Sequence, residues 1–399
     1  MSPTPLRRTL SPSATVTSVD FDLHGVVGIR LVDATPADAA AVRRQLGPME
    51  RPLAREPDVV VRFVDSLPAA RLRFAEYGRT GFTDDGFFVL QSRKRPARVR
   101  VALDGIGEQC EIVCQHGLRA VPLLMAIVTC TAIARGHVPL HASAFVHDGV
   151  GVLVTGWAKG GKTEALLAFA AHGAEYVGDE WILLSPGGRH MYGVPEHIRL
   201  QDWHLRQLPD VRARVRQSRR LLFSAIRGLD RVHRLLPGRG LLAEALPALR
   251  RQLNVQLDPH EVFARRAASF AAVPDRVFLM LGHDAPEIEV APADPLDVAR
   301  RMAASNWYEQ QPLVGAYLAY RFAFPERQST LLEGAQALQA SLLASALAGK
   351  EAYTVRHPYP CDLGQLFDAM RPACQAAPMR REPGWTSPRP TGAPAGAPA

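Results

Sequence analysis

Stretches in which apolar and polar residues alternate predict several strands in the first third of the chain. A period of two places every second side chain on the same face of a sheet, which is the pattern of a half-buried strand. A run with helical spacing, residues 37–47, lies between the first two stretches. We therefore expect residues 16–120 to form a small α/β region; its alternating stretches are 16–33, 58–65, 87–91 and 97–103.

The pattern changes after residue 120. The uncharged apolar run Val121–Ala134 predicts a buried helix, because it is well short of the roughly 20 residues that a bilayer span needs. Next come two strand-like runs, 137–147 and 150–155, joined by Asp148-Gly149, a dipeptide typical of tight hairpins. Two further strands at 277–282 and 352–356, with a helix over 295–305 between them, extend this second region to about residue 375.

Both ends of the chain have the composition of disordered segments. Residues 1–15 are rich in Ser, Thr and Pro, and residues 376–399 are rich in Pro, Ala and Gly. The first fifteen residues contain two arginines but no apolar stretch, so we expect no secretory signal and a cytoplasmic location.

The overall composition excludes a fibrous or wholly disordered protein. Hydrophobic residues make up 47% and charged residues 22% of the 399 residues, close to globular averages. The five cysteines are odd in number and scattered, and only Cys110 and Cys114 are closely spaced, in a strand-like stretch. We therefore expect buried thiols, not a disulfide framework or a zinc site.

The net charge of +8 is concentrated in one segment. Residues 206–251 hold twelve arginines against three acidic residues. Apolar residues recur there at helical spacing, which predicts a basic amphipathic helix with one apolar stripe packed inward, interrupted near Pro237 and Gly238. The arginine face is either a solvated surface or a docking site for an acidic partner; nucleic acid is disfavoured, because no aromatics are interleaved. The residues of the predicted stripe are Val211, Val215, Leu222, Ile226, Leu229 and Leu236.

The segment from Gly156 to Thr163 fits the pattern G-x-x-x-x-G-K-[ST] between a strand and a helix that Gly173 would cap. In such a loop, which we call the glycine loop, backbone N–H groups turn inward onto a phosphate chain, and the following helix N-terminus adds positive potential. Only four lysines occur in the chain, and two of them lie in this loop. The expected nucleotide-binding residues are Gly156, Lys159, Gly160, Gly161, Lys162 and Thr163, with the Thr163 hydroxyl on Mg²⁺.

Two adjacent acids, Asp179 and Glu180, lie between the short apolar strands 176–178 and 181–184. One acid could accept a proton from an attacking hydroxyl while the other holds the metal. His141 lies near the start of the preceding hairpin, and a lone histidine there is more often a satisfied core residue than a functional one.

Residues 140–184 together resemble the HPr kinase/phosphorylase family and, more distantly, the ATP-dependent phosphoenolpyruvate carboxykinases. The shared order is LHASAF, a hairpin, the glycine loop, a helix ending in Gly, and YVGDEW. The resemblance implies a mixed-sheet α/β P-loop fold and a kinase that transfers the γ-phosphate of ATP, with Mg²⁺, to a hydroxyl, typically of serine. It places Asp179 as the catalytic acid/base, Glu180 on the metal side and His141 as a supporting residue.

The sequence departs from this family at several positions. Ala158-Lys159 stands where the family has Ser-Gly, and Glu180 stands where it has Asp. Beyond Leu184 the likeness is loose, and it suggests only Glu196 and Arg199 as further site residues.

The leading hypothesis is thus an HPr kinase-like phosphotransferase with a P-loop domain over 121–375 and a basic helical insertion at about 206–251. The acceptor, either a Ser/Thr of a protein or peptide or a small hydroxylated metabolite, stays open, as does self-association. The alternative is a nucleotide-binding regulator or scaffold with little or no phosphotransfer. Nicotinamide chemistry and serine hydrolysis lack their motifs, G-x-G-x-x-G after a strand and G-x-S-x-G.

Overall fold

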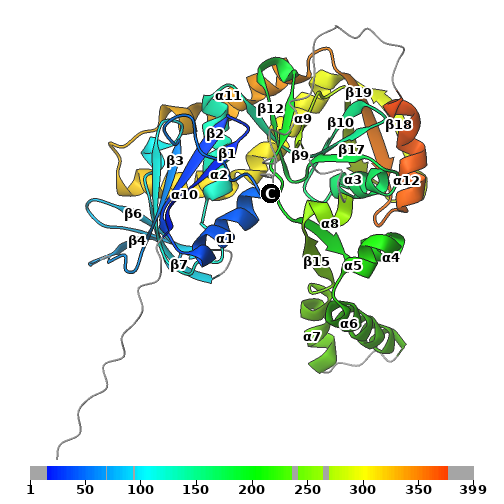
Figure 1. Ribbon diagram of the computed structural model, residues 1–399, viewed down its shortest axis with the longest axis horizontal. Coiled ribbons are helices and arrows are strands. Elements are labelled where there is room, and N and C mark those ends of the chain that lie inside the picture. Colours follow the sequence, from blue (N-terminus) through cyan, green and yellow to red (C-terminus); the bar gives the residue numbers. More distant parts are fainter. Residues whose placement is uncertain (1–15, 69, 93–94, 236–240, 264–268, 376–399) are drawn as a thin grey trace, which may run out of the picture.

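The computed structural model describes residues 16–68, 70–92, 95–235, 241–263 and 269–375. The terminal segments predicted to be disordered, 1–15 and 376–399, lie outside the described residues, as does the predicted interruption at Pro237 and Gly238. The chain is a mixed α/β protein with two large sheets that lie side by side in Figure 1, the first in blue and cyan and the second mainly in green.

The first sheet is built from residues 16–115 and confirms the strands expected there. Its strand order is β1-β2-β3-β8-β7-β6-β5-β4, with β2, β3 and β8 parallel and the other neighbours antiparallel. One predicted stretch, 16–33, is a hairpin of two strands, and the predicted helix follows it as α1 (Pro36–Leu46). The strands are β1 (Val16–Leu23), β2 (Val27–Ala34), β3 (Val59–Val64), β4 (Arg73–Glu76), β5 (Thr80–Phe82), β6 (Phe87–Ser92), β7 (Arg95–Val101) and β8 (Cys110–Gln115).

Helix α2 (Leu124–Ala134) connects the two sheets and is buried, as its uncharged sequence predicts. It contacts β2 in the first sheet and β9 (Val138–His147) in the second. The segment that leads into α2 is held by Gln45 of α1, whose side-chain amide forms two hydrogen bonds with the backbone of Val121, at 2.7 and 3.1 Å. In the described part of the chain, no helix is both long and apolar enough to cross a membrane.

The second sheet carries the candidate chemistry. Its order is β16-β13-β12-β9-β10-β17-β19-β18, and β11 also pairs with β9. The predicted hairpin is present: β9 and β10 are antiparallel, whereas β10, β17 and β19 run parallel. The remaining strands are β10 (Val150–Gly156), β11 (Glu175–Gly178), β12 (Trp181–Leu184), β13 (Met191–Gly193), β16 (Ala271–Ala272), β17 (Arg276–Gly282), β18 (Glu289–Ala293) and β19 (Glu351–His357).

Helices cover both faces of this sheet, because its central strands are apolar on both sides. Alternate residues divide between the faces: Val152 and Val154 of β10 pack with the cluster that contains α3 (Lys162–Ala170) and α12 (Leu363–Met370), and Leu153 packs with the opposite one. That opposite face is covered by α9 (Pro295–Glu309) and α11 (Thr330–Leu347). Helix α10 (Gln311–Ala323) continues from α9 and packs against α2 and against β4, β5 and β6.

Helix α3 ends slightly earlier than the sequence suggests. Its last residue is Ala170, and Gly173 lies beyond the helix in the left-handed region with φ 88°. The Gly173 N–H still donates to the Ala170 carbonyl, so the glycine closes the turn that follows the helix.

The arginine-rich segment forms a helical extension, at the bottom of Figure 1, mounted on the antiparallel ribbon of β14 (Ile198–Gln201) and β15 (Asn254–Leu257). The prediction of one inward stripe is wrong in part. Val211, Val215 and Ile226 are buried, but Leu229 is 40% exposed and Leu236 lies outside the described residues. The chain breaks between α5 and α6, so a single helical period does not run through the segment; its helices are α4 (Asp202–Gln207), α5 (Pro209–Arg214), α6 (Gln217–Leu235) and α7 (Leu241–Arg250), and α8 (Pro259–Phe263) follows β15.

Candidate functional site

The glycine loop connects β10 to α3 as predicted, and two of its glycines are required by their surroundings. Gly156 has φ 151° and Gly161 has φ 100°, a region that side chains disfavour. A Cβ on Gly161 would lie 2.4 Å from Nε2 of His357, and one on Gly156 would lie 2.9 Å from the Met280 carbonyl oxygen. Nε2 of His357 lies 2.9 Å from the Gly160 carbonyl oxygen, so the last residue of β19 contacts the loop and helps to fix its backbone.

Lys162 folds back over this loop. Its ammonium donates to the carbonyl oxygens of Trp157 at 2.8 Å and Gly156 at 3.2 Å, and the residue is buried. Burial lowers the pKa of Lys162, although the carboxylates of Glu180 and Asp179 act in the opposite direction. The Lys162 ammonium is thus held only by backbone carbonyl oxygens. An incoming anion would be a stronger partner and could draw the ammonium away from them.

Lys159 differs from Lys162. It is exposed, has φ 60°, and forms no ion pair with any described residue. The structure therefore does not bring Lys159 into the contacts that hold the rest of the predicted site together.

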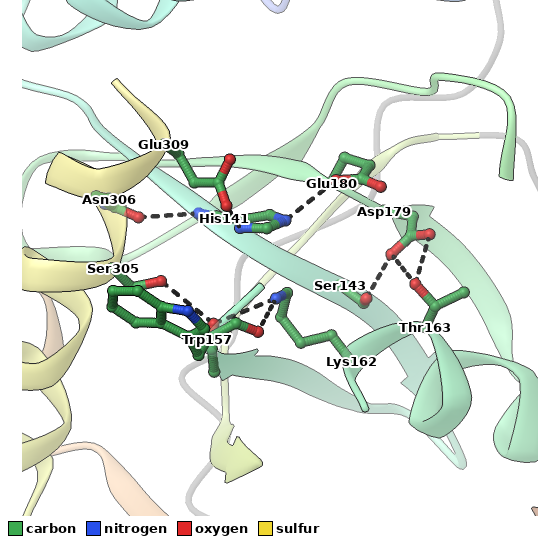
Figure 2. A network of polar contacts seen from close by, with 11 residues as sticks. His141, Ser143, Trp157, Lys162, Thr163, Asp179, Glu180, Ser305, Asn306 and Glu309 are labelled. Atoms are coloured by element: carbon green, nitrogen blue, oxygen red, sulfur yellow. Dashed lines mark hydrogen bonds and ion pairs between the residues drawn. The ribbon is translucent and has the colours of Figure 1, made fainter. Parts of the chain in front are cut away.

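Thr163 and Asp179 lie against each other, as Figure 2 shows. The Thr163 hydroxyl lies 3.1 Å from Oδ2 and 3.3 Å from Oδ1 of Asp179, and the Ser143 hydroxyl donates to Oδ1 at 2.5 Å. Asp179 is only 3% exposed, and burial together with the nearby charge of Glu180 raises its pKa to about 6. A buried carboxylate beside two hydroxyls offers the hard oxygen ligands that Mg²⁺ prefers.

His141 is clamped between two carboxylates on the other side of the site (Figure 2). Its Nε2 lies 3.1 Å from Oε2 of Glu180, and its Nδ1 lies 3.1 Å from Oε1 of Glu309 at the end of α9. Burial alone would lower the pKa of His141, but the two carboxylates raise it above its usual value. The histidine in turn lowers the pKa of both Glu180 and Glu309, so the three groups favour a charged imidazolium between two carboxylates.

The backbone around His141 is fixed by an amide. Asn306, fully buried in α9, accepts from the His141 N–H at 3.1 Å and donates to the Pro139 carbonyl oxygen at 2.7 Å. The preceding residue of α9 is Ser305, whose hydroxyl donates to the Gly156 carbonyl oxygen at 3.4 Å. Helix α9 therefore positions both the histidine strand and the glycine loop.

Adjacent acids thus have different surroundings. The Asp179 carboxylate is enclosed beside Thr163, whereas the Glu180 side chain is half exposed and faces His141. Glu180 also takes φ 70°, a strained conformation for a non-glycine residue, which turns consecutive side chains to different sides. No group of three or more His, Cys, Asp or Glu residues in the described ranges is arranged to bind a metal by itself.

An exposed aromatic pair joins the glycine loop to α9. The rings of Trp157 and Tyr308 are 4.9 Å apart at 32°, and the residues are 51% and 54% exposed. The Trp157 carbonyl holds the Lys162 ammonium, and Tyr308 directly precedes Glu309, so this ring pair, which we call the aromatic shelf, connects the loop to the end of α9 that carries the partner of His141.

Of the two outlying candidates, Arg199 is exposed on β14, and its charge contributes to the lowered pKa of Glu180. Glu196 precedes that strand, and its backbone N–H donates to the Val194 carbonyl oxygen. Burial raises the pKa of the Tyr176 hydroxyl, and the charges of Asp179 and Glu196 add to this effect.

Sequence reasoning missed several site residues. Ser143 is two positions from His141 in one strand and so shares its face, which was a usable signal. His357 ends a strand parallel to β10, so it meets the loop at the same edge of the sheet. The α9 residues had no signal, because only tertiary packing brings them there: Ser305, Asn306, Tyr308 and Glu309.

The five cysteines are free and buried, as expected. Burial raises the pKa of Cys110 to about 12 and keeps these thiols protonated. They take no part in the site.

Comparison with known proteins identifies neither a matching family model nor a curated protein of similar sequence.

Proposed function

We propose that this protein is an ATP- and Mg²⁺-dependent kinase of the HPr kinase-like type, which transfers the γ-phosphate of ATP to a hydroxyl group. The contact between Thr163 and Asp179 carries the proposal. It joins the hydroxyl at the end of a G-x-x-x-x-G-K-[ST] loop to a buried carboxylate just after β11, the pairing that holds Mg²⁺ beside bound nucleotide in phosphate-binding loops.

The arrangement of the sheet supports an HPr kinase/phosphoenolpyruvate carboxykinase-like P-loop fold. In this chain the strand before the glycine loop has an antiparallel neighbour, β9, on one side and the parallel strand β17 on the other. Rossmann-type units instead have parallel neighbours joined by crossover helices. The hairpin also carries His141, which brings the histidine next to the loop.

The residues of the loop would bind the nucleotide. Backbone N–H groups of residues 161–163 at the N-terminus of α3 favour a phosphate chain, and Lys162 would exchange its two carbonyl partners for phosphate oxygens. When bound, ATP with Mg²⁺ supplies the transferable phosphoryl group and neutralises its charge. Asp179, Thr163 and water complete the oxygen ligands, so a site with one protein carboxylate suffices.

The contacts favour a division of roles that reverses the one implied by the family resemblance. Asp179 is enclosed beside Thr163, which suits the metal side. Glu180 is half exposed, so an acceptor hydroxyl can reach it, and we assign to it the acceptance of the hydroxyl proton. His141, held by Glu309, would orient Glu180 and carry positive charge close to the transferring group.

The acceptor would approach from the side of the aromatic shelf. Trp157 lies next to the ammonium that reaches the terminal phosphate, and Tyr308 lies next to Glu309. A side chain or ring attached to the acceptor hydroxyl can pack on these two faces, and both proteins and small metabolites meet that condition.

The test is label transfer from γ-labelled ATP with Mg²⁺, using cell extract divided into macromolecules and small molecules as acceptors. Label that depends on Lys162, judged against Lys162→Ala, supports the kinase, and the labelled fraction identifies the acceptor class. ATP binding without transfer to either fraction, unchanged by Glu180→Gln, contradicts the kinase and favours the nucleotide-binding regulator.

A further inference from the structure

A second aromatic pair lies at the end of β19. The rings of Trp203, on α4, and Tyr359, two residues beyond β19, are 5.8 Å apart and meet at 89°. Tyr359 is 56% exposed, and Trp203 is half-buried. Burial raises the pKa of the Tyr359 hydroxyl, although a hydrogen bond with the Trp203 side chain acts in the opposite direction. Two perpendicular rings, one of them open to solvent, can hold a flat ligand by its face and its edge, and we call this pair the aromatic corner.

The Tyr359 side of the aromatic corner is tied to the glycine loop. His357, the last residue of β19, contacts the Gly160 carbonyl oxygen through Nε2 at 2.9 Å, and Tyr359 follows it by two residues. Strands β10, β17 and β19 run parallel, so their carboxyl ends lie at one edge of the sheet. Ligands of open α/β sheets bind at this edge. Tyr359 therefore lies where the sheet presents its ligand-binding edge.

The Trp203 side of the corner is tied to the first turn of α3. Nε2 of His204 lies 3.1 Å from Oε1 of Glu164, and both residues are buried. The rings of Trp203 and His204 are 4.0 Å apart. Because Glu164 directly follows Thr163, this contact holds α4 beside the N-terminus of α3, which faces the expected phosphates.

Gln207 fixes the two sides of the corner relative to each other. Its side-chain amide accepts a hydrogen bond from the Leu363 N–H at 2.8 Å and donates one to the Cys361 carbonyl oxygen at 3.2 Å. Helix α4 is thereby bound to the segment that follows Tyr359. Rings that are already held in place lose little conformational freedom when a ligand binds, which favours binding.

The glycine loop defines the direction in which a nucleotide lies. In loops of this type the lysine reaches the β- and γ-phosphates, and backbone N–H groups hold the α- and β-phosphates. The Lys162 ammonium lies at the Trp157 carbonyl oxygen, so the terminal phosphate belongs at that end of the loop. The base extends from the other end of the phosphate chain. The aromatic shelf adjoins the terminal-phosphate end, whereas the aromatic corner adjoins the opposite end, beside Glu164.

We propose that the aromatic corner, Trp203 and Tyr359, is the subsite that binds the base of the nucleoside triphosphate by stacking. An aromatic ring open to solvent at this end of the loop supplies the π face on which a base stacks. The inference rests on nucleotide binding, which is one part of the proposed function, and does not depend on phosphoryl transfer.

Calorimetry with the full chain separates the base from the phosphates. Tyr359→Ala should weaken binding of Mg²⁺·ATP about 10-fold and leave binding of Mg²⁺·tripolyphosphate, which has no base, within about 2-fold. Tyr359→Phe keeps the ring and should retain the parent affinity for ATP within about 3-fold. Tyr77→Ala, which removes an 88% exposed tyrosine in the turn after β4, is the matched control and should change neither affinity. Because both tyrosines are exposed, the thermal midpoint, measured in parallel, should not change.

Photolabelling with an azidoadenosine triphosphate locates the base directly, because its reactive azide is attached to the base. We expect label on peptides that contain Trp203 or Tyr359, and excess ATP should prevent it. Label on peptides that contain Trp157 or Tyr308, an ATP affinity unchanged by Tyr359→Ala, or an equal loss of tripolyphosphate affinity would each overturn the base subsite while leaving nucleotide binding intact. A parent protein that binds neither ATP nor tripolyphosphate would overturn the proposed function as well.

Discussion

Nδ1 of His141 lies 3.1 Å from a carboxylate oxygen of Glu309, which joins the strand before the glycine loop to the end of α9. Because Glu180 occupies the other side of the same ring, His141 is the centre of a row of three charged groups. Asn306 on α9, one helical turn before Glu309, holds the His141 backbone by accepting a hydrogen bond from its N–H. Helix α9 is therefore part of the candidate site, although its sequence carries no motif.

Glu309→Gln should lower the pKa of His141 by removing one of the two charges that raise it. Because the pKa of His141 is higher in the folded state than in the unfolded state, its protonation stabilises the fold at pH values below the unfolded-state pKa. This stabilisation is lost as the pH rises through the folded-state pKa. The loss should therefore be smaller and should be complete at lower pH in the variant. An NMR titration of the His141 ring checks the shift; phosphotransfer should fall about 10-fold with Mg²⁺·ATP affinity little changed. An unaltered His141 titration would show that the contact has no electrostatic effect.

Asp179→Asn should stabilise the protein while removing its metal site. The raised pKa of Asp179 means that the folded state holds the proton more tightly than the unfolded state, so stability falls as pH rises from about 4 to about 6. Asparagine lacks the buried charge, and we expect it to gain on the order of 1–3 kcal/mol at pH 8 and much less at pH 4. Urea unfolding at both pH values measures the difference. If the variant is less stable than the parent at pH 8, burial of the Asp179 charge does not destabilise the folded protein as we assume.

Mg²⁺-dependent ATP binding should weaken as pH falls through about 6, because protons compete with the metal for the Asp179 carboxylate. Titration calorimetry between pH 5 and 8 gives the dependence. Glu180→Gln should retain this pH dependence of ATP affinity, and Asp179→Asn should lose it. The protonation of ATP itself affects the parent and both variants equally, so it cancels in the comparison. If Glu180→Gln instead removes the pH dependence, the roles of the two acids are exchanged.

The two loop lysines should differ sharply. Lys162→Ala should reduce ATP affinity by 10-fold or more, because its ammonium is the cation poised over the loop. Lys159→Ala is the matched control: Lys159 is exposed and has no ion-pair partner in the described chain, so we expect a change of less than about 3-fold. The change in tryptophan fluorescence on adding ATP, compared with that of Trp157→Phe, offers a binding signal from the residue whose carbonyl holds the Lys162 ammonium.

Trp157→Ala should affect the acceptor more than the nucleotide. The shelf formed with Tyr308 is exposed and connects the loop to α9, and we assign it to the acceptor, so its loss should raise the KM for the acceptor several-fold while ATP affinity changes little. Tyr308→Ala should have the same effect, since it removes the other half of the shelf. A loss of ATP affinity alone would place the shelf under the nucleotide base instead.

Local patterns were sufficient to predict much of this fold. The strands, the hairpin at Asp148-Gly149 and the helix after the glycine loop follow from periodicity and turn residues, and the structure confirms them. The sequence could assign Thr163 and Asp179 separately to a phosphate-binding motif. It could not predict that they touch, because that contact depends on the pairing of β11 with β9.

Long-range packing and solvent exposure were not predictable in the same way. Glu309 reaches His141 only because α9 crosses the sheet face, which depends on the whole second core. The stripe of α6 was misjudged because an amphipathic pattern shows that a face is apolar but does not show which face contacts the protein; Phe223 and Ile226 take the inward side and leave Leu229 outside.

The most direct measurement of the central claim is a ³¹P NMR time course of the purified protein with Mg²⁺·ATP and the acceptor fraction that takes up label. The account predicts a growing phosphomonoester resonance with matching loss of ATP and gain of ADP, absent in both Lys162→Ala and Glu180→Gln. ADP with inorganic phosphate and no phosphomonoester, or a phosphomonoester signal that survives both substitutions, would contradict it.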